Sequence, residues 1–312
     1  MKKNKRKIRL IIVLFLLLVT TGCTKTLTDS NKKPVKNDET GQTLTENILC
    51  RPTNQYTKKI YEKSKKVDLK KLPECKDFKI TSGKYEGLWT SIFVKPLAFI
   101  LLRLGEFVKN YGLSVIIVSL IIRFIAYPIT KKTAMQSELM KKAQPELNRL
   151  QKKYENKKDQ ESMMKQNQEM MAIYKKYNIN PMSGCAFAML QLPIFVAFFE
   201  AVQRTPVIFE DKFLGLQLGT TPSVGITSAT FYAYIVLILL IAATTFFSFK
   251  MNSAGNTEDP TMKMMPTMMS IMIVVTAVFM PTGLGIYWVT SNLFTIVQNM
   301  LVKRSKKING KA

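Results

Sequence analysis

One charged side chain lies inside an apolar stretch that is long enough to cross a membrane. The stretch Gly112–Thr130 carries a few hydroxyls and a single guanidinium, that of Arg123. A charged residue near the middle of a span costs about 2.5–3.5 kcal/mol, and an arginine does not escape this cost by losing its proton. Arg123 therefore needs a counter-charge, a water-filled cavity or a polar client, and which of these it uses determines the chemistry of the protein.

Other kinds of chemistry are restricted by what the sequence lacks. The chain has no histidine, which excludes His-dependent nucleophiles and His-ligated metal sites. The predicted spans carry no carboxylate pair and no clear Ser-Lys pair at their centres, and the sequence has no glycine-rich phosphate loop. We therefore expect no enzyme activity, no cofactor and no metal. A copper site in the Met-rich segment 262–272 is the alternative to packing by these methionines.

The composition indicates which elements must hold this arginine. Of the 312 residues 47% are hydrophobic, yet the net charge is +25. This combination fits apolar spans that alternate with basic loops. Nucleic-acid binding is another explanation of the charge, but the lysines and arginines fall beside apolar runs and not in a folded basic domain. No DNA partner is therefore expected.

Five apolar segments are each close to the roughly 20 residues that cross a bilayer. They cover 112–130, 185–203, 231–249, 265–280 and 284–302, and Pro281-Thr282-Gly283 predicts a tight turn between the last two. Lysine and arginine are concentrated between the first two spans and in the C-terminal tail, and they are sparse in 204–230. This distribution predicts that the long loop and the tail are cytoplasmic and that the N-terminus lies outside.

Two further helical elements are expected beside the spans. Residues 87–110 are amphipathic but too polar to span easily, so they predict an interfacial helix on the outer surface, with a further span as the alternative. In the basic loop 131–181, apolar residues recur at helical spacing on either side of a polar turn at 157–159. This pattern predicts an antiparallel helical hairpin. The hairpin is either a solvated connector or a receiving surface for nascent chains and ribosomes.

The N-terminus has the pattern of an export signal. Basic residues at 2–9 precede a short apolar core at 10–19 and then Gly22-Cys23. The apolar core is too short for a comfortable span, which favours a signal peptide. The segment resembles a bacterial lipoprotein signal, in which residues 1–22 are removed and Cys23 is acylated. Ordinary signal cleavage and an uncleaved anchor are the alternatives.

The Lys-rich segment that follows, 23–86, shows little apolar periodicity. It predicts a flexible extracellular tether. Cys50 and Cys75 lie within this segment and share an oxidising compartment. They either form a disulfide or remain two free surface thiols.

Motifs at the helix ends resemble one known family. From about residue 86 to residue 303, the chain resembles the YidC branch of the YidC/Oxa/Alb membrane protein insertases, in a form with a lipoprotein-type N-terminus. The resemblance rests on the order and spacing of Arg123, Tyr127-Pro128-Ile129-Thr130-Lys131, Gln144-Pro145, Met170–Lys175, Asn180–Cys185, Gln191-Leu192-Pro193-Ile194-Phe195, Pro281–Leu284, Tyr287-Trp288, Ser291-Asn292-Leu293 and Thr295–Gln298.

The resemblance implies an all-α polytopic membrane protein whose five core spans, within 111–303, enclose a hydrophilic groove. Arg123 matches the groove arginine of the family. Polar or aromatic positions on core helices are matched by Gln191, Trp288, Ser291, Asn292 and Gln298. The structural alternatives are that Arg123 is satisfied within the bundle, for example by Ser119, that the polar residues make helix–helix hydrogen bonds, and that Trp288 serves packing or an interfacial belt.

The function that the resemblance implies is insertion and folding of integral membrane proteins, and of lipoproteins as further clients, alone or with the Sec translocon. The expected location is the bacterial plasma membrane. Expected partners are nascent membrane proteins, membrane lipids and the ribosome, the last through the hairpin and the basic tail 304–312. A transporter or channel is the alternative class, but paired intramembrane charges and broken repeat helices are not evident in the sequence.

Overall fold

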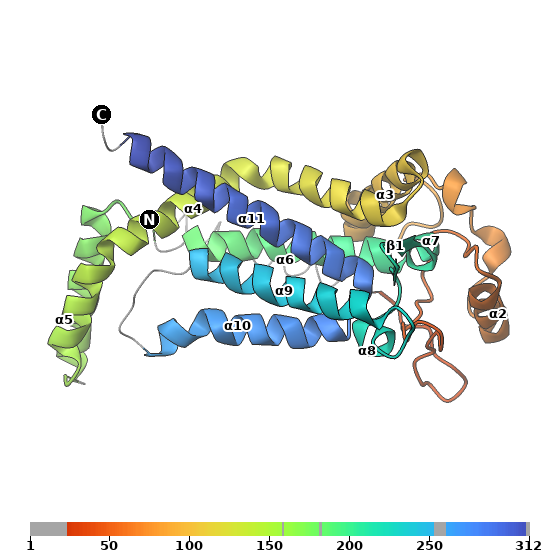
Figure 1. The fold of residues 1–312 in the computed structure, drawn as a ribbon, viewed down its shortest axis with the longest axis horizontal. Helices are drawn as coiled ribbons and strands as arrows, with labels where there is room; N and C mark the ends of the chain where they lie inside the picture. Colours follow the sequence, from red (N-terminus) through yellow and green to blue (C-terminus); the bar gives the residue numbers. More distant parts are fainter. Residues whose placement is uncertain (1–23, 158, 181–182, 253–259, 310–312) are drawn as a thin grey trace. The chain divides into compact units, whose positions relative to one another are not determined.

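The chain is almost entirely helical in the computed structural model, which describes residues 24–157, 159–180, 183–252 and 260–309 (Figure 1). Short elements are a π-helix at Thr90–Val94, 3-10 turns at Leu69–Lys71 and Cys75–Asp77, α7 (Pro206–Glu210), α8 (Pro222–Gly225) and the antiparallel pair β1 (Lys212–Phe213) and β2 (Leu216–Gln217). The longer helices are α2 (Gln55–Ser64), α3 (Lys95–Val108), α4 (Tyr111–Tyr154), α5 (Gln160–Lys176), α6 (Ser183–Gln203), α9 (Phe231–Asn252), α10 (Pro260–Val278) and α11 (Thr282–Asn309).

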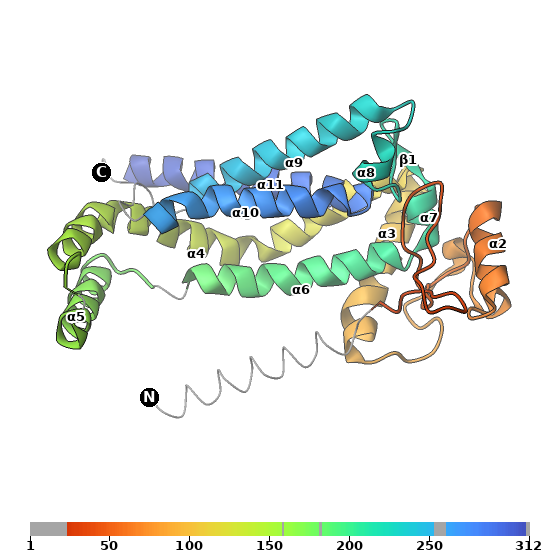
Figure 2. The same ribbon diagram turned by 90° about the horizontal axis from the view of Figure 1, so that it is seen from below.

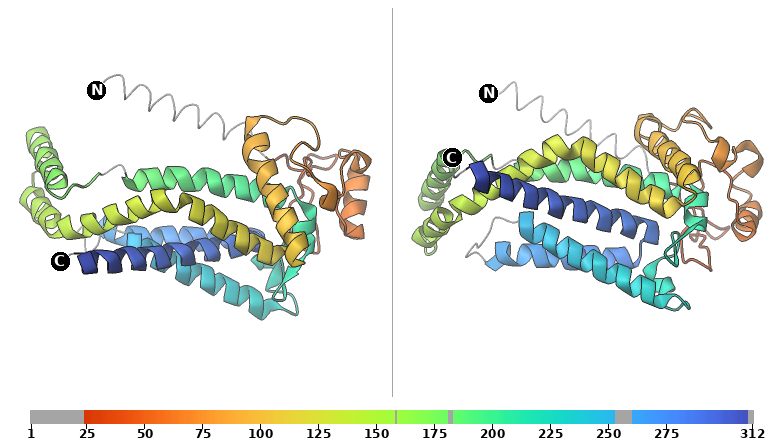
Figure 3. Two further views of the ribbon diagram at one scale, coloured as in Figure 1. Left: turned by 90° about the horizontal axis from the view of Figure 1, so that it is seen from above. Right: turned by 45° about the horizontal axis from the view of Figure 1, so that its top comes forward.

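The described residues form two compact units. The first contains residues up to 118, 192–238 and 277–287, and the second contains 119–191, 239–276 and 288 onward. In the first unit, α7 and α8 lie near the N-terminal segment, defined here as residues 24–86, which contains α2 (Figure 2). In the second unit, α5 lies beside the C-terminal part of α4 (Figure 3). Arg123 and the hairpin therefore belong to the second unit, and the N-terminal segment belongs to the first.

Five long helices, α4, α6, α9, α10 and α11, occupy the ranges of the five predicted spans. Within the described residues, Tyr111–Tyr154 and Phe231–Asn252 are long and apolar enough to cross a membrane, each with a best-window mean hydropathy of 2.1. Gln191–Gln203 and Pro266–Val278 are shorter apolar helical stretches. A tight turn separates the last two helices, but it lies at 279–281 and not at 281–283, because α10 ends at Val278 and α11 begins at Thr282.

The end of the first predicted span differs from the expectation. The first span was predicted to end at Thr130 and to be followed by a separate helix, whereas α4 runs without a break from Tyr111 to Tyr154 and contains Pro128 and Pro145. The lysines after Thr130 mark the change in polarity, but lysine, alanine, methionine, glutamine and leucine are all good helix formers. Polarity therefore sets where the apolar part ends, and helix propensity lets the backbone continue.

The segment 24–86 is folded, which differs from the flexible tether predicted for it. Leu27, Leu44, Ile48 and Tyr61 form a buried cluster. The Tyr61 hydroxyl donates to the Thr45 carbonyl oxygen at 3.0 Å. Turns and isolated β-bridges, and not one long helix or strand, bring these apolar residues together. Their spacing in the sequence therefore has neither helical nor strand periodicity. A search for periodic patterns therefore misses this small core.

Arg204 attaches this folded segment to the rest of the first unit. Its side chain is fully buried, and its Nε donates to the Asn47 carbonyl oxygen at 2.6 Å. One terminal nitrogen lies 2.7 Å from a carboxylate oxygen of Glu86, and the Arg204 carbonyl accepts from the Leu49 backbone N–H at 2.8 Å. A buried guanidinium is tolerated only where several acceptors meet it, so this junction depends on all of these contacts.

A second buried cation lies at the start of α3. Lys95 is 4% exposed, and its ammonium donates to the carbonyl oxygens of Ser82 and Lys84 at 2.6 and 3.2 Å. Burial lowers the pKa of the Lys95 ammonium, and the nearby Glu86 carboxylate opposes this effect. The Lys95 ammonium thus fixes the loop that precedes α3 by hydrogen bonding to two of its carbonyl groups.

The first turn of α4 is fixed by the connection that follows α7. The Asp211 carboxylate accepts from the Tyr111 backbone N–H at 2.7 Å, which satisfies one of the free donors at the helix start. At Gly112, an added Cβ would lie 2.3 Å from the Cβ of Phe213 on β1. Only glycine permits this close approach, so the residue that opens the first span is set by packing.

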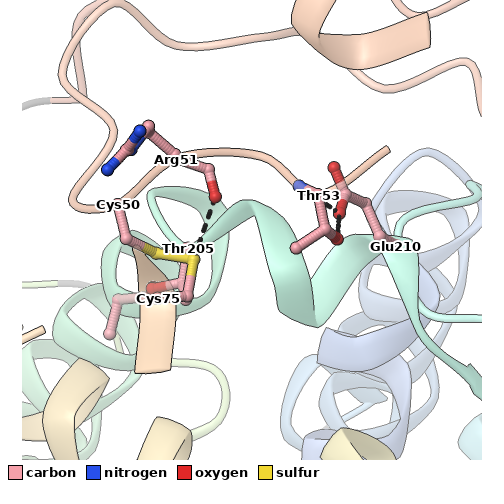
Figure 4. Close-up of a disulfide and its surroundings, with 7 residues drawn as sticks. Cys50, Arg51, Thr53, Cys75, Thr205 and Glu210 are labelled. Atoms are coloured by element: carbon pink, nitrogen blue, oxygen red, sulfur yellow. Dashed lines mark hydrogen bonds between the residues drawn. A yellow bond between two sulfur atoms is a disulfide. The ribbon is translucent and has the colours of Figure 1, made fainter. Parts of the chain in front are cut away.

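Cys50 and Cys75 are joined by a disulfide within the first unit (Figure 4). Their Cα atoms are 4.9 Å apart, and 25 positions separate them in the sequence. Next to the bridge, Thr53 and Glu210 are hydrogen bonded, and the Thr53 backbone N–H lies 2.8 Å from the Glu210 carboxylate. The bridge and this contact lie at the side of the segment that packs against α7.

Replacing both bridge cysteines should loosen segment 24–86. Closing a loop of this length stabilises a chain by about 3 kcal/mol in the chain-entropy account. In Cys50→Ser/Cys75→Ser, proteolysis of the segment by protease added outside intact cells should therefore be faster than in the wild type. The Cys185→Ser variant serves as the control and should be cleaved at the wild-type rate. Equal cleavage of the double variant and the wild type would show that the bridge does not stabilise the segment.

Candidate functional site

Arg123 lies on the buried side of α4. It is 7% exposed, and Ser119, Ala126 and Thr130 are buried at helical spacing on the same side. The opposite side carries large exposed apolar residues, which include Phe124, Ile125 and Ile129. In a helix that crosses a membrane, this distribution directs the apolar side chains to lipid and the arginine to the protein interior.

Helix α11 also has a polar inner side. Ser291, Thr295, Gln298 and Asn299 are buried on it, and Asn292 is half-buried. Its outer side is apolar and exposed, with Leu293, Val297, Met300 and Leu301. In the second unit, α4 and α11 therefore both bury polar side chains and expose apolar ones.

Hydrogen bonds join this polar side of α11 to α4 and α9. The Thr130 hydroxyl donates to the Gln298 side-chain oxygen at 3.0 Å. The Asn292 amide donates to the Thr245 hydroxyl at 2.9 Å, and the Asn299 amide donates to the Asn252 side-chain oxygen at 3.1 Å. The two asparagine bonds each join residues 47 positions apart, so α9 and α11 run in parallel there.

The facing side of α9 is polar as well. Thr244, Thr245 and Ser248 are buried, whereas Leu239, Leu240 and Phe247 are exposed. The buried polar side chains of α4, α9 and α11 form one set, called here the polar interior of the second unit. Its members are Ser119, Arg123, Thr130, Thr244, Thr245, Ser248, Ser291, Thr295, Gln298 and Asn299.

Two buried atoms of the polar interior have no hydrogen-bond partner among the described residues. They are the Ser291 hydroxyl oxygen and the Gln298 side-chain nitrogen. A buried polar group without a partner costs about 1–3 kcal/mol, so such groups normally meet water or a ligand. The polar interior thus offers hydrogen-bonding groups beyond those that hold the helices together.

The six predicted groove residues all belong to the second unit. Asn292 bonds to Thr245 and Gln298 bonds to Thr130, which are the helix–helix contacts that were the alternative to a groove role. Gln191 and Trp288 are half-buried. The analysis of the sequence missed Thr130, Thr245, Asn252 and Asn299 as partners. A signal was available for two of these, because Asn299 follows Asn292 by one heptad, as Asn252 follows Thr245.

The predicted helical hairpin is confirmed in the second unit. Ala143 and Leu147 of α4 and Ile179 after α5 form its buried core. The Lys153 ammonium contacts Glu169 at 2.7 Å, and the Asn180 backbone N–H donates to the Gln136 side chain at 2.8 Å. Positions that rise along α4 meet positions that fall along α5, so the pair is antiparallel.

The hairpin surface carries both ion pairs and exposed apolar side chains. The Lys153 ammonium and the Tyr154 hydroxyl hold the pKa of the Glu169 carboxyl below its usual range. Met163, Met164 and Met171 of α5 are exposed. Flexible thioether side chains suit contacts with apolar segments of varied shape.

The remaining residues to place are Cys23, the possible metal ligands and Glu200, whose role the sequence leaves open. Cys23 and residues 1–22 lie outside the described residues. Within the described part of the chain, no group of three His, Cys, Asp or Glu side chains is placed to hold a metal. Glu200 is 2% exposed, and one of its carboxylate oxygens accepts from the Trp89 indole N–H at 3.1 Å in the first unit.

The unpartnered Ser291 hydroxyl predicts that water reaches the polar interior. In Cys185→Ser background, Ser291→Cys should react with a membrane-impermeant maleimide about tenfold faster than Leu293→Cys, because thiolates form in water and not in hydrocarbon. Leu293 is the matched control, since it lies two residues away on the exposed apolar side. The initial labelling rate in inside-out vesicles is the measurement. Equal, slow labelling of both thiols would mean that the interior is dry.

Comparison with known proteins identifies the family. A family model described as 60Kd inner membrane protein matches residues 103–310. Membrane protein insertase YidC 2 of Bacillus anthracis is 37% identical over 222 residues, which cover 70% of this chain and 83% of the relative. Membrane protein insertase MisCA of Bacillus subtilis is 36% identical over 217 residues, which cover 69% and 79%.

One further relative and one solved structure also match this chain. Membrane protein insertase YidC of Oceanobacillus iheyensis is 36% identical over 227 residues, which cover 70% of this chain and 85% of the relative. A solved structure described as an active YidC insertase with the first transmembrane domain resolved is 21% identical, with a TM-score of 0.45, and the match covers 78% of this chain and 52% of that chain. From the family model and the three relatives, the chain belongs to the 60Kd inner membrane protein family, the family of the YidC membrane protein insertases.

Proposed function

We propose that this membrane protein is an insertase and chaperone that inserts and folds integral membrane proteins, with lipoproteins as further clients. The observation that carries the proposal is the polar interior of the second unit, which holds Arg123 on the buried side of an apolar helix. Helix packing uses some of these groups, but the Ser291 hydroxyl oxygen and the Gln298 side-chain nitrogen have no partner among the described residues. The names of the relatives, which are membrane protein insertases, support the same conclusion.

The proposed mechanism lowers the cost of moving polar chain through hydrocarbon. Each unsatisfied polar group in lipid costs several kcal/mol. In a hydrophilic groove open to the cytoplasm, Ser291, Gln298 and water would meet the polar groups of the client's tail. Arg123 would attract acidic residues of that tail, because its charge persists at all physiological pH values.

Release follows from the same division of polarity. The client's own span is apolar, and its transfer to lipid is favourable by about 25 cal/mol for each Å² of apolar surface that is buried. The span would therefore leave the groove sideways and remain in the bilayer. The transfer is downhill in free energy and no bond is made or broken, so the proposed process uses no nucleotide, metal or catalytic residue.

The proposed topology places segment 24–86 outside and the loop 131–181 in the cytoplasm. The charge distribution favours this orientation, since the loop 131–181 and the tail 304–312 are rich in lysine. Removal of residues 1–22 and acylation of Cys23 would anchor the N-terminus at the outer surface. Residues 87–110 would lie on that surface, where Phe93, Ile100 and Phe107 are exposed. In this arrangement the core is 111–303.

The hairpin is the proposed receiving surface for clients. Its exposed methionines would contact apolar segments of nascent chains. Its lysines and the basic tail would attract ribosomal RNA. The Sec translocon and membrane lipids are further proposed partners.

Removal of the Arg123 charge should slow insertion of clients with acidic tails. In liposomes without nucleotide, we expect Arg123→Ala to insert such a client about tenfold more slowly than the wild type, equivalent to about 1.4 kcal/mol. Arg123→Lys should keep most of the rate because it keeps a cation. The measurement is the protease-protected fraction of the client over time.

A client with a neutral tail is the matched control for this experiment. The difference between wild type and Arg123→Ala should largely disappear with it, since the attraction is lost. If Arg123→Ala inserts both clients at the wild-type rate, Arg123 has a structural role only. If the wild type inserts neither client, the insertase proposal is wrong, and transport of small solutes should be tested next.

Acylation of Cys23 is tested separately. Cells fed an alkyne fatty acid should label the wild-type protein, and Cys23→Ala should lose the label and retain the uncleaved signal. The larger apparent mass of Cys23→Ala in gels reports the second effect. Labelling that persists in Cys23→Ala would place the lipid elsewhere and contradict the lipoprotein interpretation.

A further inference from the structure

A cleft in the first unit carries charges that the insertase function does not use. It has a volume of about 730 Å³ and lies between the disulfide-bonded segment and the ends of α3, α4 and α7. This volume falls within the roughly 300–1,000 Å³ that is usual for small-ligand sites. Its charged lining includes Arg51, Lys58, Lys70, Glu62, Glu74 and Glu106.

Two of the three carboxylates in the cleft already have cationic partners. Glu74 lies 2.9 Å from the Lys76 ammonium, and Glu106 lies 3.2 Å from the Arg103 guanidinium. Arg51, Lys58 and Lys70 form no ion pair within the described residues, and the charges of Arg51 and Lys58 also act on Glu74, which Lys76 already pairs. The cleft therefore has an excess of positive charge.

The backbone of Arg51 is fixed by a hydrogen bond and by the neighbouring disulfide. Its backbone N–H donates to the Pro73 carbonyl oxygen at 2.9 Å, and it follows directly after the bridged Cys50. Figure 4 shows its guanidinium directed away from the bridge, whereas its carbonyl oxygen faces Cys75. The Nε of Arg51 is buried and has no hydrogen-bond partner among the described residues. A buried donor in this state costs free energy that a ligand oxygen would recover.

We propose that this cleft binds a phosphate-bearing polyol, either a phospholipid headgroup or a soluble phosphate ester. The planar guanidinium of Arg51 matches two phosphate oxygens, and Lys58 and Lys70 add point charges. A phosphate monoester, with a charge of about −1.5 to −2, balances these cations better than a single carboxylate does, and the phosphodiester of a phospholipid headgroup still offers two free oxygens to the guanidinium. Glu62 accepts a hydrogen bond from a ligand hydroxyl. The site is independent of the polar interior and of the insertase proposal.

Titration calorimetry of the full-length protein in an uncharged maltoside detergent, with sn-glycerol 3-phosphate as the probe, tests the proposal. We expect saturable binding to the wild type and a loss of affinity of about tenfold or more in Arg51→Gln. Lys58→Gln should also weaken binding, by about threefold to tenfold. The matched control is Lys59→Gln, which removes the same charge from the next, exposed residue of α2 and should change affinity by less than about twofold.

Two results would overturn the proposal. One is the absence of saturable binding to the wild type. The other is equal affinity losses in Arg51→Gln and Lys59→Gln, which would indicate general attraction by surface charge. Unchanged protease resistance of segment 24–86 in each variant shows that folding is intact.

Nanodiscs distinguish the two sources of the ligand. The titration is repeated in phosphatidylcholine and in a mixture with phosphatidylglycerol. If the headgroup occupies the cleft, the mixture weakens glycerol phosphate binding to the wild type. If soluble esters are the ligand, both lipid environments give the same affinity.

Discussion

The requirement that every polar group in hydrocarbon has a partner governs the second unit. Arg123 meets it by lying on the inner side of α4, and the amides and hydroxyls of α9 and α11 meet it by facing inward. The same requirement leaves Phe124, Ile125 and Leu293 on the outside. Apart from the hairpin, the unit is therefore polar inside and apolar outside, the reverse of a soluble domain. The proposed function uses this reversal, because the polar groups that the helices do not use for one another can meet those of a client.

Segment 24–86 of the first unit meets the opposite requirement. Its apolar cluster around Leu27 and Tyr61 is buried, and its lysines are mostly exposed. Next to this segment, Lys95 and Arg204 are both buried, and Arg204 is bonded to Asn47 and Glu86. Such a buried charge is expensive unless all its donors are used, so it ties three distant parts of the sequence into one arrangement. The Cys50–Cys75 bridge restrains the same region covalently.

Much of the fold was predictable because local physics decides it. The lengths of the apolar segments predicted the five long helices, and the helical spacing of apolar residues predicted the hairpin. Pro281 indicated the break between the last two helices. Two of the predictions that differed from the structure have a clear physical reason. α4 continues past Thr130, because a change of polarity is not a helix stop. The segment 24–86 is folded because non-periodic residues converge through turns, and a method that seeks periodicity does not detect such a core.

The sequence by itself determined the family, the all-α membrane architecture and the identity of Arg123 as the unusual residue, because these depend on composition, length and ordered motifs. It also supplied the candidate site residues. Only the tertiary structure decided their partners: Asn292 with Thr245, Gln298 with Thr130, and Arg204 with Asn47 and Glu86. The physical reason is that a hydrogen bond acts over about 3 Å, whereas these pairs are 47 to 168 positions apart in the chain. Which polar groups meet is therefore a property of how the helices pack.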